Sequence, residues 1–382
     1  RATSGGPWAS VELLRVVDDK CQKLFDNCFK VLDGPDAPDL EIVELNQALI
    51  FYISNPKTSN NYLEKYDEYD NTIRQPNDND PTQRNDSTYV FEGYQIYQLR
   101  DATVTLESKD DPDLVRLVAQ FDKKNGVTTL VNYYLDESIG GNVPVVEVQG
   151  GDNGISHSFI ITTDAFATTS RELVNHKQYY YTAVAYAYNE YMPYSQEPGV
   201  FNGLYGQKKP YLAGRRNIKT YSAIPHPTLN GQVLRSSYGD GPQVTRIQGQ
   251  GNGGNLLELT EETVEEILKK DLVDSLNQMG SPDYPIAYNP VYKHGHGPLN
   301  VKVIDPLNVK GANYEIRFNA DSIINPPGDS INIETGRWIL TDLETNTEYP
   351  SEKRITVRNE QLFIDLGISV NIEQSLSPGD SL

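Results

Sequence analysis

Apolar residues recur at steps of three or four along residues 7–32. They are Val11, Leu14, Val17, Cys21, Leu24, Cys28 and Leu32. This spacing predicts an amphipathic helix, with Ser10 as its N-cap and Asp33-Gly34-Pro35 at its end. Because a lone amphipathic helix must bury its apolar face, we expect it to pack on the next domain or on chain that precedes residue 1.

From residue 35 to about 225 the pattern changes to short runs rich in β-branched and aromatic residues, separated by turn residues. These runs predict strands at residues 40–45, 49–54, 89–99, 114–121, 127–135, 156–162, 178–188 and 217–223. Seven or eight strands joined by turns favour an antiparallel β-sandwich.

Two insertions interrupt this pattern. Residues 55–87 are rich in Asn, Asp and Tyr and almost empty of aliphatic residues, so we expect a long surface loop. Residues 190–216 join the last two predicted strands. At 27 residues this second insertion is far longer than a hairpin loop of about 2–5 residues.

The remaining chain predicts a linker and a second β-rich domain. Residues 227–257, which include the run GQGNGGN, are rich in Gly, Gln and Asn and predict a linker with little core. Residues 260–277 predict a helix with Thr260 as cap and acidic residues in its first turn. The strands expected after it are VKVID, YEIRFN, INIE, RWILTDL, RITVRN and LFIDL, and no closing strand is identified. We therefore divide the chain into a helical linker (1–33), a sandwich (34–226), a linker (227–257) and an incomplete helix-plus-β domain (258–382).

Composition narrows the function. The 33 basic and 53 acidic residues give a net charge of −20, which disfavours binding to nucleic acid and to anionic lipid. No apolar run approaches the roughly 18 residues of a membrane span. The 25 Tyr, 29 Gly and 23 Pro against only 2 Met are typical of a turn-rich extracellular β protein.

The two ends of the sequence suit a fragment of a longer protein. The sequence begins at Arg1 without an apolar leader and ends in a loop-like segment, so we interpret it as an internal piece of a longer chain or a processed product.

Cys21 and Cys28 lie about 10 Å apart along the predicted helix, beyond the reach of a disulfide. We expect two apolar residues on one helix face, while a bond across a helix end or to chain outside this sequence stays open.

The segment 34–225 resembles a fibronectin type III domain. Pro35-Asp-Ala-Pro38 followed by LEIVEL is similar to the proline-led first strand of that family, and GYQIY at 93–97 to its third strand. Leu173 lies six residues before Tyr179, as in the family's tyrosine corner, in which the Tyr hydroxyl bonds upstream backbone. Residues 49–54 lack the family's Trp, and the insertions double the usual length. The resemblance implies a fibronectin- or immunoglobulin-like sandwich.

A second resemblance concerns residues 24–225 and, more loosely, the rest of the chain. FDNCFKVLDGPDAPDL, FEGYQIYQL, LVNHKQYYYTAVAYAYNEY and GQKKPYLAGRRNIKT look like segments of very large exported surface proteins of the Bacteroidota. Such proteins typically use type IX secretion, with a C-terminal sorting domain that this sequence does not contain. The resemblance implies a secreted or cell-surface location more than any activity.

Catalytic signatures are missing from the sequence. No G-x-S-x-G, H-E-x-x-H or P-loop pattern occurs, so the sequence predicts no enzyme. His294-Gly295-His296 places two imidazoles around a glycine, but no third metal ligand is identifiable, and a polar loop is the favoured interpretation. We predict no cofactor other than calcium.

Calcium prefers oxygen ligands such as closely spaced carboxylates, and PNDNDPTQRND supplies Asp78, Asp80 and Asp86. The EF-hand spacing is not met, and a solvated acidic loop is the favoured alternative. Asp110, Asp111 and Asp113 form a similar candidate.

Asp-Ser followed by an aliphatic residue or Thr recurs along the chain. The pattern resembles the O-glycan acceptor motif of exported Bacteroidota proteins. The candidate acceptors are Ser87, Ser322 and Ser330, and chance matches are the alternative.

The insertion at 190–216 carries the predicted protein-contact residues, because Tyr and Arg are favoured in binding hot spots. They are Tyr191, Tyr194, Tyr205, Lys208, Lys209, Tyr211, Arg215 and Arg216. The alternative is that the tyrosines shield the sandwich core. We expect the loop to be ordered and to pack on a neighbouring domain.

The sequence therefore favours a non-enzymatic secreted or cell-surface module that acts as scaffold, spacer or adhesive segment of a larger protein. Expected partners are other domains of the same chain, neighbouring copies, or glycans. Two alternatives are an accessory region of a large secreted hydrolase and a subunit of an extracellular filament or sheath.

Overall fold

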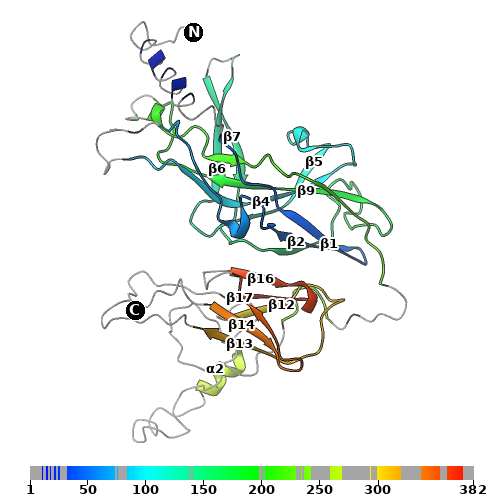
Figure 1. The fold of residues 1–382 in the computed structure, drawn as a ribbon. Helices are drawn as coiled ribbons and strands as arrows, with labels where there is room; N and C mark the ends of the chain where they lie inside the picture. Colours follow the sequence, from blue (N-terminus) through cyan, green and yellow to red (C-terminus); the bar gives the residue numbers. More distant parts are fainter. Residues whose placement is uncertain are drawn as a thin grey trace, which may run out of the picture. The chain divides into compact units, whose positions relative to one another are not determined.

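A computed structural model describes residues 32–73, 84–136, 141–197, 203–228, 259–268, 299–319, 337–352 and 359–372, with single residues or short runs elsewhere. Its contacts divide the chain into two units. The first comprises residues 1–41, 53–155 and 163–224, and the second comprises 42–52, 156–162 and 225–382. The protein is mainly β, with several antiparallel sheets, as the sequence predicts (Figure 1).

The principal sheet of the first unit is built on two long strands, β4 (Thr88–Leu99) and β9 (Tyr179–Tyr188), which pair along almost their whole length (Figure 1). Both were predicted at nearly these bounds. β9 is flanked by β10 (Tyr211–Ala213) and β11 (Thr220–Ala223), and β4 by β3 (Asp67–Tyr69) and β5 (Val115–Asp122).

Small and large side chains alternate across this pair of strands. Ala185 of β9 lies opposite Tyr94 of β4, and Ala183 lies opposite Ile96, all of them fully buried. An alanine beside each bulky residue lets the buried face pack without voids. The sequence run YTAVAYAY therefore gives a strand with buried residues on both faces.

A hairpin of β6 (Thr129–Asp136) and β7 (Gly141–Gln149) forms a sheet of its own. β6 was predicted, but β7, β3 and β10 were not. The sequence of β7 contains Pro144, which lacks the N–H that an interior strand needs, so its sequence resembles a loop. Pro144 lies opposite Tyr133 in the register, and a proline is accommodated in such an edge strand.

Three further predicted strands form one sheet in the order β1 (Asp39–Leu45), β2 (Ala48–Ser54) and β8 (Ser158–Ile161). Six of the seven residues of β2 are buried, which explains why ALIFYIS lacks polar alternation. In the second unit, Ile50 and Tyr52 of β2 pack with Ile304, and the Tyr52 hydroxyl donates to the Ile304 carbonyl.

The C-terminal part of the second unit contains two three-stranded sheets. One has the order β12 (Leu299–Val303), β17 (Ile368–Ile372), β16 (Asn359–Phe363), and the other β13 (Tyr314–Asn319), β14 (Arg337–Asp342), β15 (Thr347–Pro350). Their apolar cluster includes Trp338, Leu340 and Val370. The prediction of LFIDL as one strand was wrong, because β16 ends at Phe363 and Ile364–Leu366 form a 3₁₀ turn. The central strand β17, which follows this turn, was not predicted.

The predicted helices are only partly described. All seven described residues between 11 and 25 are helical, but Val11, Leu14 and Cys21 of the expected apolar face are exposed. Cys21 is a free thiol, and Cys28 lies outside the described residues. The second predicted helix is described as α2 (Glu261–Leu268), with the Thr260 hydroxyl accepting from the Thr263 N–H as the expected cap.

The two segments predicted as a surface loop and as a linker with little core both contribute buried or half-buried residues. In the first insertion, Tyr66 and Ile73 are buried, Tyr62–Glu64 form a 3₁₀ turn, and β3 follows. In the predicted linker, Tyr238 packs in the cluster around Ile304, where Gly239 and Asp240 bond the backbone of Val303. Further 3₁₀ turns lie at Leu106–Ser108 and Gly203–Tyr205.

Candidate interaction surface

The β6–β7 hairpin packs on the principal sheet of the first unit through a small apolar cluster. Leu130 and Val148 of the hairpin contact Tyr186 of β9 and Tyr211 of β10, whose ring centroids lie 5.3 Å apart. Gly93 of β4, opposite Tyr186 in the register, makes room for this tyrosine. A Cβ at Gly93 would stand 2.6 Å from the Tyr186 hydroxyl, so only glycine fits there.

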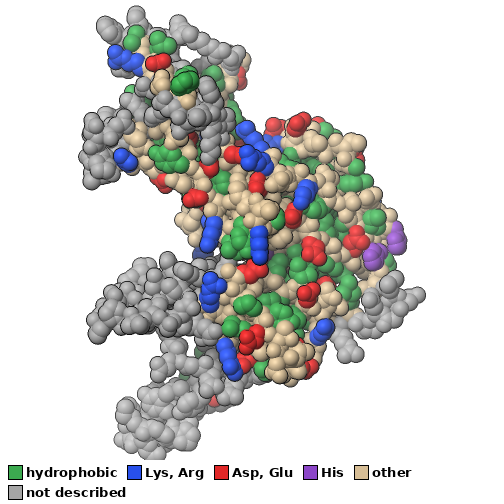
Figure 2. Space-filling model, in the orientation of Figure 1, with side chains coloured by type: hydrophobic (Ala, Val, Ile, Leu, Met, Phe, Trp, Pro, Cys, Tyr) green, Lys and Arg blue, Asp and Glu red, His purple; other side chains and the backbone are tan. Residues whose placement is uncertain are grey.

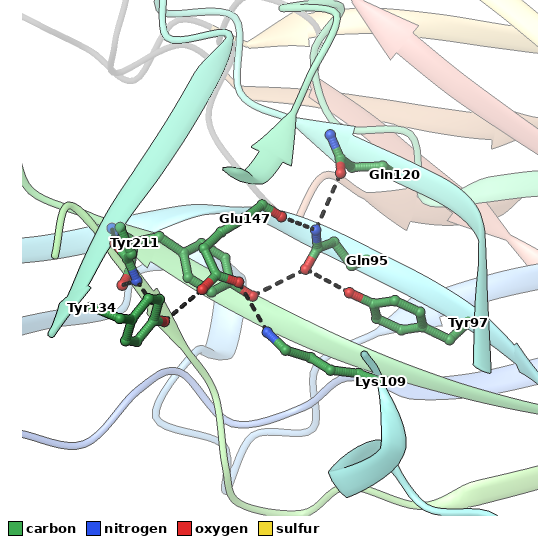
Figure 3. A network of polar contacts seen from close by, with 8 residues as sticks. Gln95, Tyr97, Lys109, Gln120, Tyr134, Glu147 and Tyr211 are labelled. Carbon is green, nitrogen blue, oxygen red and sulfur yellow. Dashed lines mark hydrogen bonds and ion pairs between the residues drawn. The ribbon is translucent and has the colours of Figure 1, made fainter. Parts of the chain in front are cut away.

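Beside this cluster lies a polar network centred on Gln95, which is 1% exposed (Figure 3). The Gln95 Nε2 donates to Gln120 Oε1 (3.2 Å) and to the Glu147 carbonyl (3.0 Å). Its Oε1 accepts from the hydroxyls of Tyr97 and Tyr211, each at 3.0 Å. The network therefore joins β4, β5, β7 and β10 through one buried amide.

The carboxylate of Glu147, whose side chain is only 7% exposed, links the network to two partly exposed side chains (Figure 3). It accepts from Lys109 Nζ (2.9 Å) and from the Tyr134 hydroxyl (2.5 Å). Burial, with the bond to Glu147 as a smaller cause, raises the pKa of Tyr134, so this phenol stays a proton donor. Tyr134 is thus held in one orientation while part of its ring remains exposed.

Two side-chain amides tie the hairpin to the second insertion. Asn132 Nδ2 donates to the Tyr211 carbonyl and its Oδ1 accepts from the Tyr211 N–H, both at 3.0 Å. Gln196 Nε2 donates to the Asn142 carbonyl (2.8 Å), and its Oε1 accepts from the Asn142 N–H (3.2 Å). Each amide therefore takes the place of one residue of a neighbouring strand.

The structure gives the predicted contact residues different roles. Tyr194 is buried, with its ring 4.8 Å from that of Tyr133 and its hydroxyl accepting from Asn142 Nδ2. Tyr211 is also buried, and it lies in β10, within the segment predicted as an insertion between strands. The prediction that Tyr194 and Tyr211 make contacts with a partner was wrong, because both fill the space under the hairpin.

The other tyrosines and the lysines of the insertion are at the surface. Tyr205 is exposed, and its carbonyl accepts from the Tyr191 hydroxyl at 2.7 Å. The Lys208 ammonium lies 5.1 Å from the centroid of the Tyr194 ring, and that of Lys209 lies 5.2 Å from Tyr134. These ammonium groups stand over ring faces and remain in water, a favourable arrangement worth about 0.5–1 kcal/mol each.

Arg215 and Arg216 are exposed but lie beyond β10, and Arg216 forms an ion pair with Asp33 at 2.6 Å. Together, the hairpin and the insertion carry a set of exposed or half-buried aromatic, aliphatic and lysine side chains, here named the tyrosine–lysine surface. Its residues are Tyr133, Tyr134, Leu135, Val146, Tyr191, Leu204, Tyr205, Lys208 and Lys209. On the face drawn in Figure 2, basic side chains form small groups among acidic and apolar ones.

The sequence analysis predicted only four of the nine residues of this surface, all of them in the insertion. The insertion was predicted as an ordered contact loop, and its described residues pack on the hairpin of the same unit. Gln95, Glu147 and Lys109 were not selected. The available signal was Gln95, a polar residue placed between two large apolar residues in the run GYQIYQL.

The calcium candidates find no support in the described residues. Asp78 and Asp80 lie outside them, and Asp86 accepts from the Thr88 N–H in a local turn. Asp111 likewise accepts from the Asp113 N–H. Within the described part of the chain, no group of three His, Cys, Asp or Glu side chains is arranged to hold a metal ion. His294 and His296 are not among the described residues.

Of the glycosylation candidates, only Ser87 is described, and it is buried. Its hydroxyl accepts from Gln75 Nε2 at 2.8 Å and bonds the Asn85 carbonyl. A glycan on this oxygen requires the local turn to open. Ser322 and Ser330 lie outside the described residues.

One further cluster of reactive side-chain types lies within the second unit. Glu360 accepts from Lys302 Nζ (2.9 Å), the Ser158 hydroxyl (3.3 Å) and the His157 N–H (2.8 Å). Tyr238 lies 3.2 Å from the Ser158 Oγ. Lys302 lowers the pKa of Glu360 against the opposing effect of burial, so this carboxylate is a charged structural anchor and a poor proton acceptor.

Comparisons with known proteins give no family for this chain: no family model, no curated protein and no solved structure matches it. Among the described residues, no helix is both long and apolar enough to cross a membrane.

Proposed function

We propose that this chain is a non-enzymatic interaction module of a larger secreted or cell-surface protein, acting as scaffold, spacer or adhesive segment. In this proposal, the first unit is built on a sandwich of the fibronectin type III kind, and the tyrosine–lysine surface makes the contact. The single observation that carries the proposal is the rigid support of that surface by the buried Gln95 network.

Rigid support matters because ordering a loop on binding costs free energy, which a preformed surface avoids. Tyr134 is fixed by Glu147, and Tyr191 is fixed by the carbonyl of Tyr205. Exposed aromatic rings combined with aliphatic side chains such as Leu135 and Val146 suit a protein partner, since tyrosine is favoured in binding hot spots.

Photo-crosslinking in the cells that make the protein tests this proposal. Tyr205 (45% exposed) is replaced by p-benzoyl-phenylalanine, and Leu117 of β5 (48% exposed) carries the same replacement as a matched control. We expect a discrete cross-linked protein from position 205 and none from 117. Equal, unspecific cross-linking from both positions contradicts the proposal.

The location is tested in the same cells. Trypsin added to intact cells releases peptides of this chain if it lies at the cell surface, and the culture medium contains the chain if it is secreted. Recovery only after lysis overturns the extracellular part of the proposal.

A further inference from the structure

Glu92 occupies an unusual place at the root of the hairpin. Phe91 pairs with Ala187 and Gly93 with Tyr186, so Glu92 is the extra residue of a β-bulge in β4. Bulges re-aim side chains, and this one directs a carboxyl group that is 1% exposed. The Glu92 carbonyl accepts from the Lys123 N–H at 2.9 Å.

The side chain of Glu92 holds the turn from which the hairpin begins. Both of its oxygens accept from Asn125 Nδ2, at 3.0 and 2.8 Å. Asn125 lies between β5 and β6, and its own Oδ1 accepts from the Val127 N–H at 2.9 Å. Glu92 thereby fixes one end of the hairpin.

The other end of the hairpin joins the same group of contacts. Asp152, just beyond β7, accepts from the N–H groups of Asn125 (2.7 Å) and Gly126 (2.9 Å). The Asp152 N–H in turn donates to Asp122 Oδ2 at 2.9 Å. Both ends of β6–β7 are therefore fastened around Glu92, Asp122 and Asp152.

The surroundings of Glu92 disfavour its charge. Burial is the largest cause, and the neighbouring carboxylates Asp122 and Asp152 add to it, so the pKa of Glu92 is raised to about 7. The bond from Asn125 and the charge of Lys123 oppose this rise, and the Lys123 ammonium lies 5.2 Å from the centroid of the Phe91 ring.

The strand that borders this place adds no charge. Tyr186 of β9 presents a buried hydroxyl that has no hydrogen-bond partner among the described residues, and burial, Asp122 and Glu92 raise the pKa of this phenol. Glu92, the third carboxyl group at the hairpin root beside Asp122 and Asp152, is therefore mostly neutral below about pH 7 and mostly charged above it.

We propose that Glu92 is a proton-controlled anchor: its neutral form fastens the root of the β6–β7 hairpin to β4, and its charged form loosens that root. The inference rests on the proposed function, because the hairpin carries four of the nine residues of the tyrosine–lysine surface. Loosening it exposes Gln95 and the apolar cluster to water and disperses the residues of that surface.

Hydrogen exchange measured by mass spectrometry on the full chain at pH 5.5 and pH 8.5, corrected for intrinsic exchange rates, tests the anchor. We expect the protection of peptides from residues 129–149 to fall about tenfold or more at pH 8.5, while peptides from 179–188 change little. Glu92→Gln keeps an acceptor for Asn125 without a charge, so its hairpin protection should be equal at both values. Glu107→Gln, at an exposed position, should behave like the wild type.

A change of less than twofold in the wild-type hairpin overturns the inference, and so does a full wild-type change in the Glu92→Gln variant. The wild-type measurement decides even if that variant fails to fold. Cross-linking from position 205 at pH 5.5 remains an independent test of the proposed function, so the two failures are distinguishable.

Discussion

The side chain of Asn132 pairs with both backbone polar groups of Tyr211, a residue 79 positions later in the chain. The two residues are 2% and 6% exposed, so water cannot replace these bonds. The amide thus joins an edge of the hairpin to β10, close to the backbone bond from the Tyr133 N–H to the Lys208 carbonyl (2.7 Å). Together with the Gln196 amide, it holds the second insertion under the hairpin.

Replacing Asn132 with alanine should destabilise the first unit by about 2–4 kcal/mol, because the N–H and C=O of Tyr211 are left buried without partners. Denaturant unfolding measures the loss. Thr129→Ala, at an exposed position of the same strand, is the control and should change the stability by less than about 0.5 kcal/mol. A loss below 1 kcal/mol for Asn132→Ala means that water reaches Tyr211.

Tyr186 and Tyr211 form a natural pair for comparison, since they share one cluster but differ in their hydroxyls. The Tyr211 hydroxyl donates to Gln95, whereas that of Tyr186 finds no partner within the described part of the chain. Tyr211→Phe should cost about 1–2 kcal/mol, and Tyr186→Phe should be neutral or stabilising by up to about 1 kcal/mol. Thermal unfolding of both variants measures the two changes in stability. Equal losses of stability would contradict the finding that only the Tyr211 hydroxyl makes a hydrogen bond.

Gly93 is required by its neighbours. A Cβ there would lie 2.2 Å from the Phe121 carbonyl oxygen, which is backbone and cannot turn away. Gly93→Ala should therefore cost about 1–3 kcal/mol or more, and it should lower the protection of β4 and β9 in hydrogen exchange. Gly311→Ala is the control, because no atom lies within 4 Å of the added carbon. A Gly93→Ala variant with wild-type stability would show that β5 can move away from the added carbon.

The Tyr179 hydroxyl accepts from the Val174 N–H at 2.9 Å, which is the upstream bond that the tyrosine-corner spacing suggested. Tyr179→Phe should destabilise the first unit by about 1 kcal/mol, since the bond fixes the approach to β9. The neighbouring Tyr180→Phe should have a smaller effect. Similar values for the two variants would show that this bond is dispensable.

The Lys302–Glu360 pair should give the second unit an acid-sensitive stability. The folded-state pKa of Glu360 lies below its usual 4.5, so its contribution is present above pH 4.5 and is lost as the pH falls through the folded value. Lys302→Met leaves a buried charge without its cation and should cost about 3–5 kcal/mol at pH 7. The Lys302→Met variant should also lose less stability than the wild type as the pH falls from 5 to 3.

Unfolding followed by the fluorescence of Trp338, which lies in the core of the second unit, reports this change. Lys310→Met, at an exposed position, is the control. A Lys302→Met variant with wild-type stability and an unchanged acid slope contradicts a structural role for the pair.

The sequence alone determined most strands and the chemistry of the second insertion. Runs such as ALIFYIS and QYYYTAVAYAY carry enough β-propensity to form strands in almost any context, so β2 and β9 follow from local preference. The cap at Thr260 and the bond of Tyr179 likewise depend on residues close in sequence. Interactions of this kind leave a periodic or spaced pattern that the sequence displays.

Only the tertiary structure decided which tyrosines are buried and which carboxyl group is perturbed. Tyr194 and Tyr211 are buried because a hairpin 50 or more residues earlier covers them, and β7 forms because β6 and Gln196 bind its backbone despite Pro144. Glu92, the extra residue of a bulge in β4, owes its raised pKa first to burial and then to the charges of Asp122 and Asp152. Burial and electrostatics depend on distances through space, and these are set by how distant strands pair.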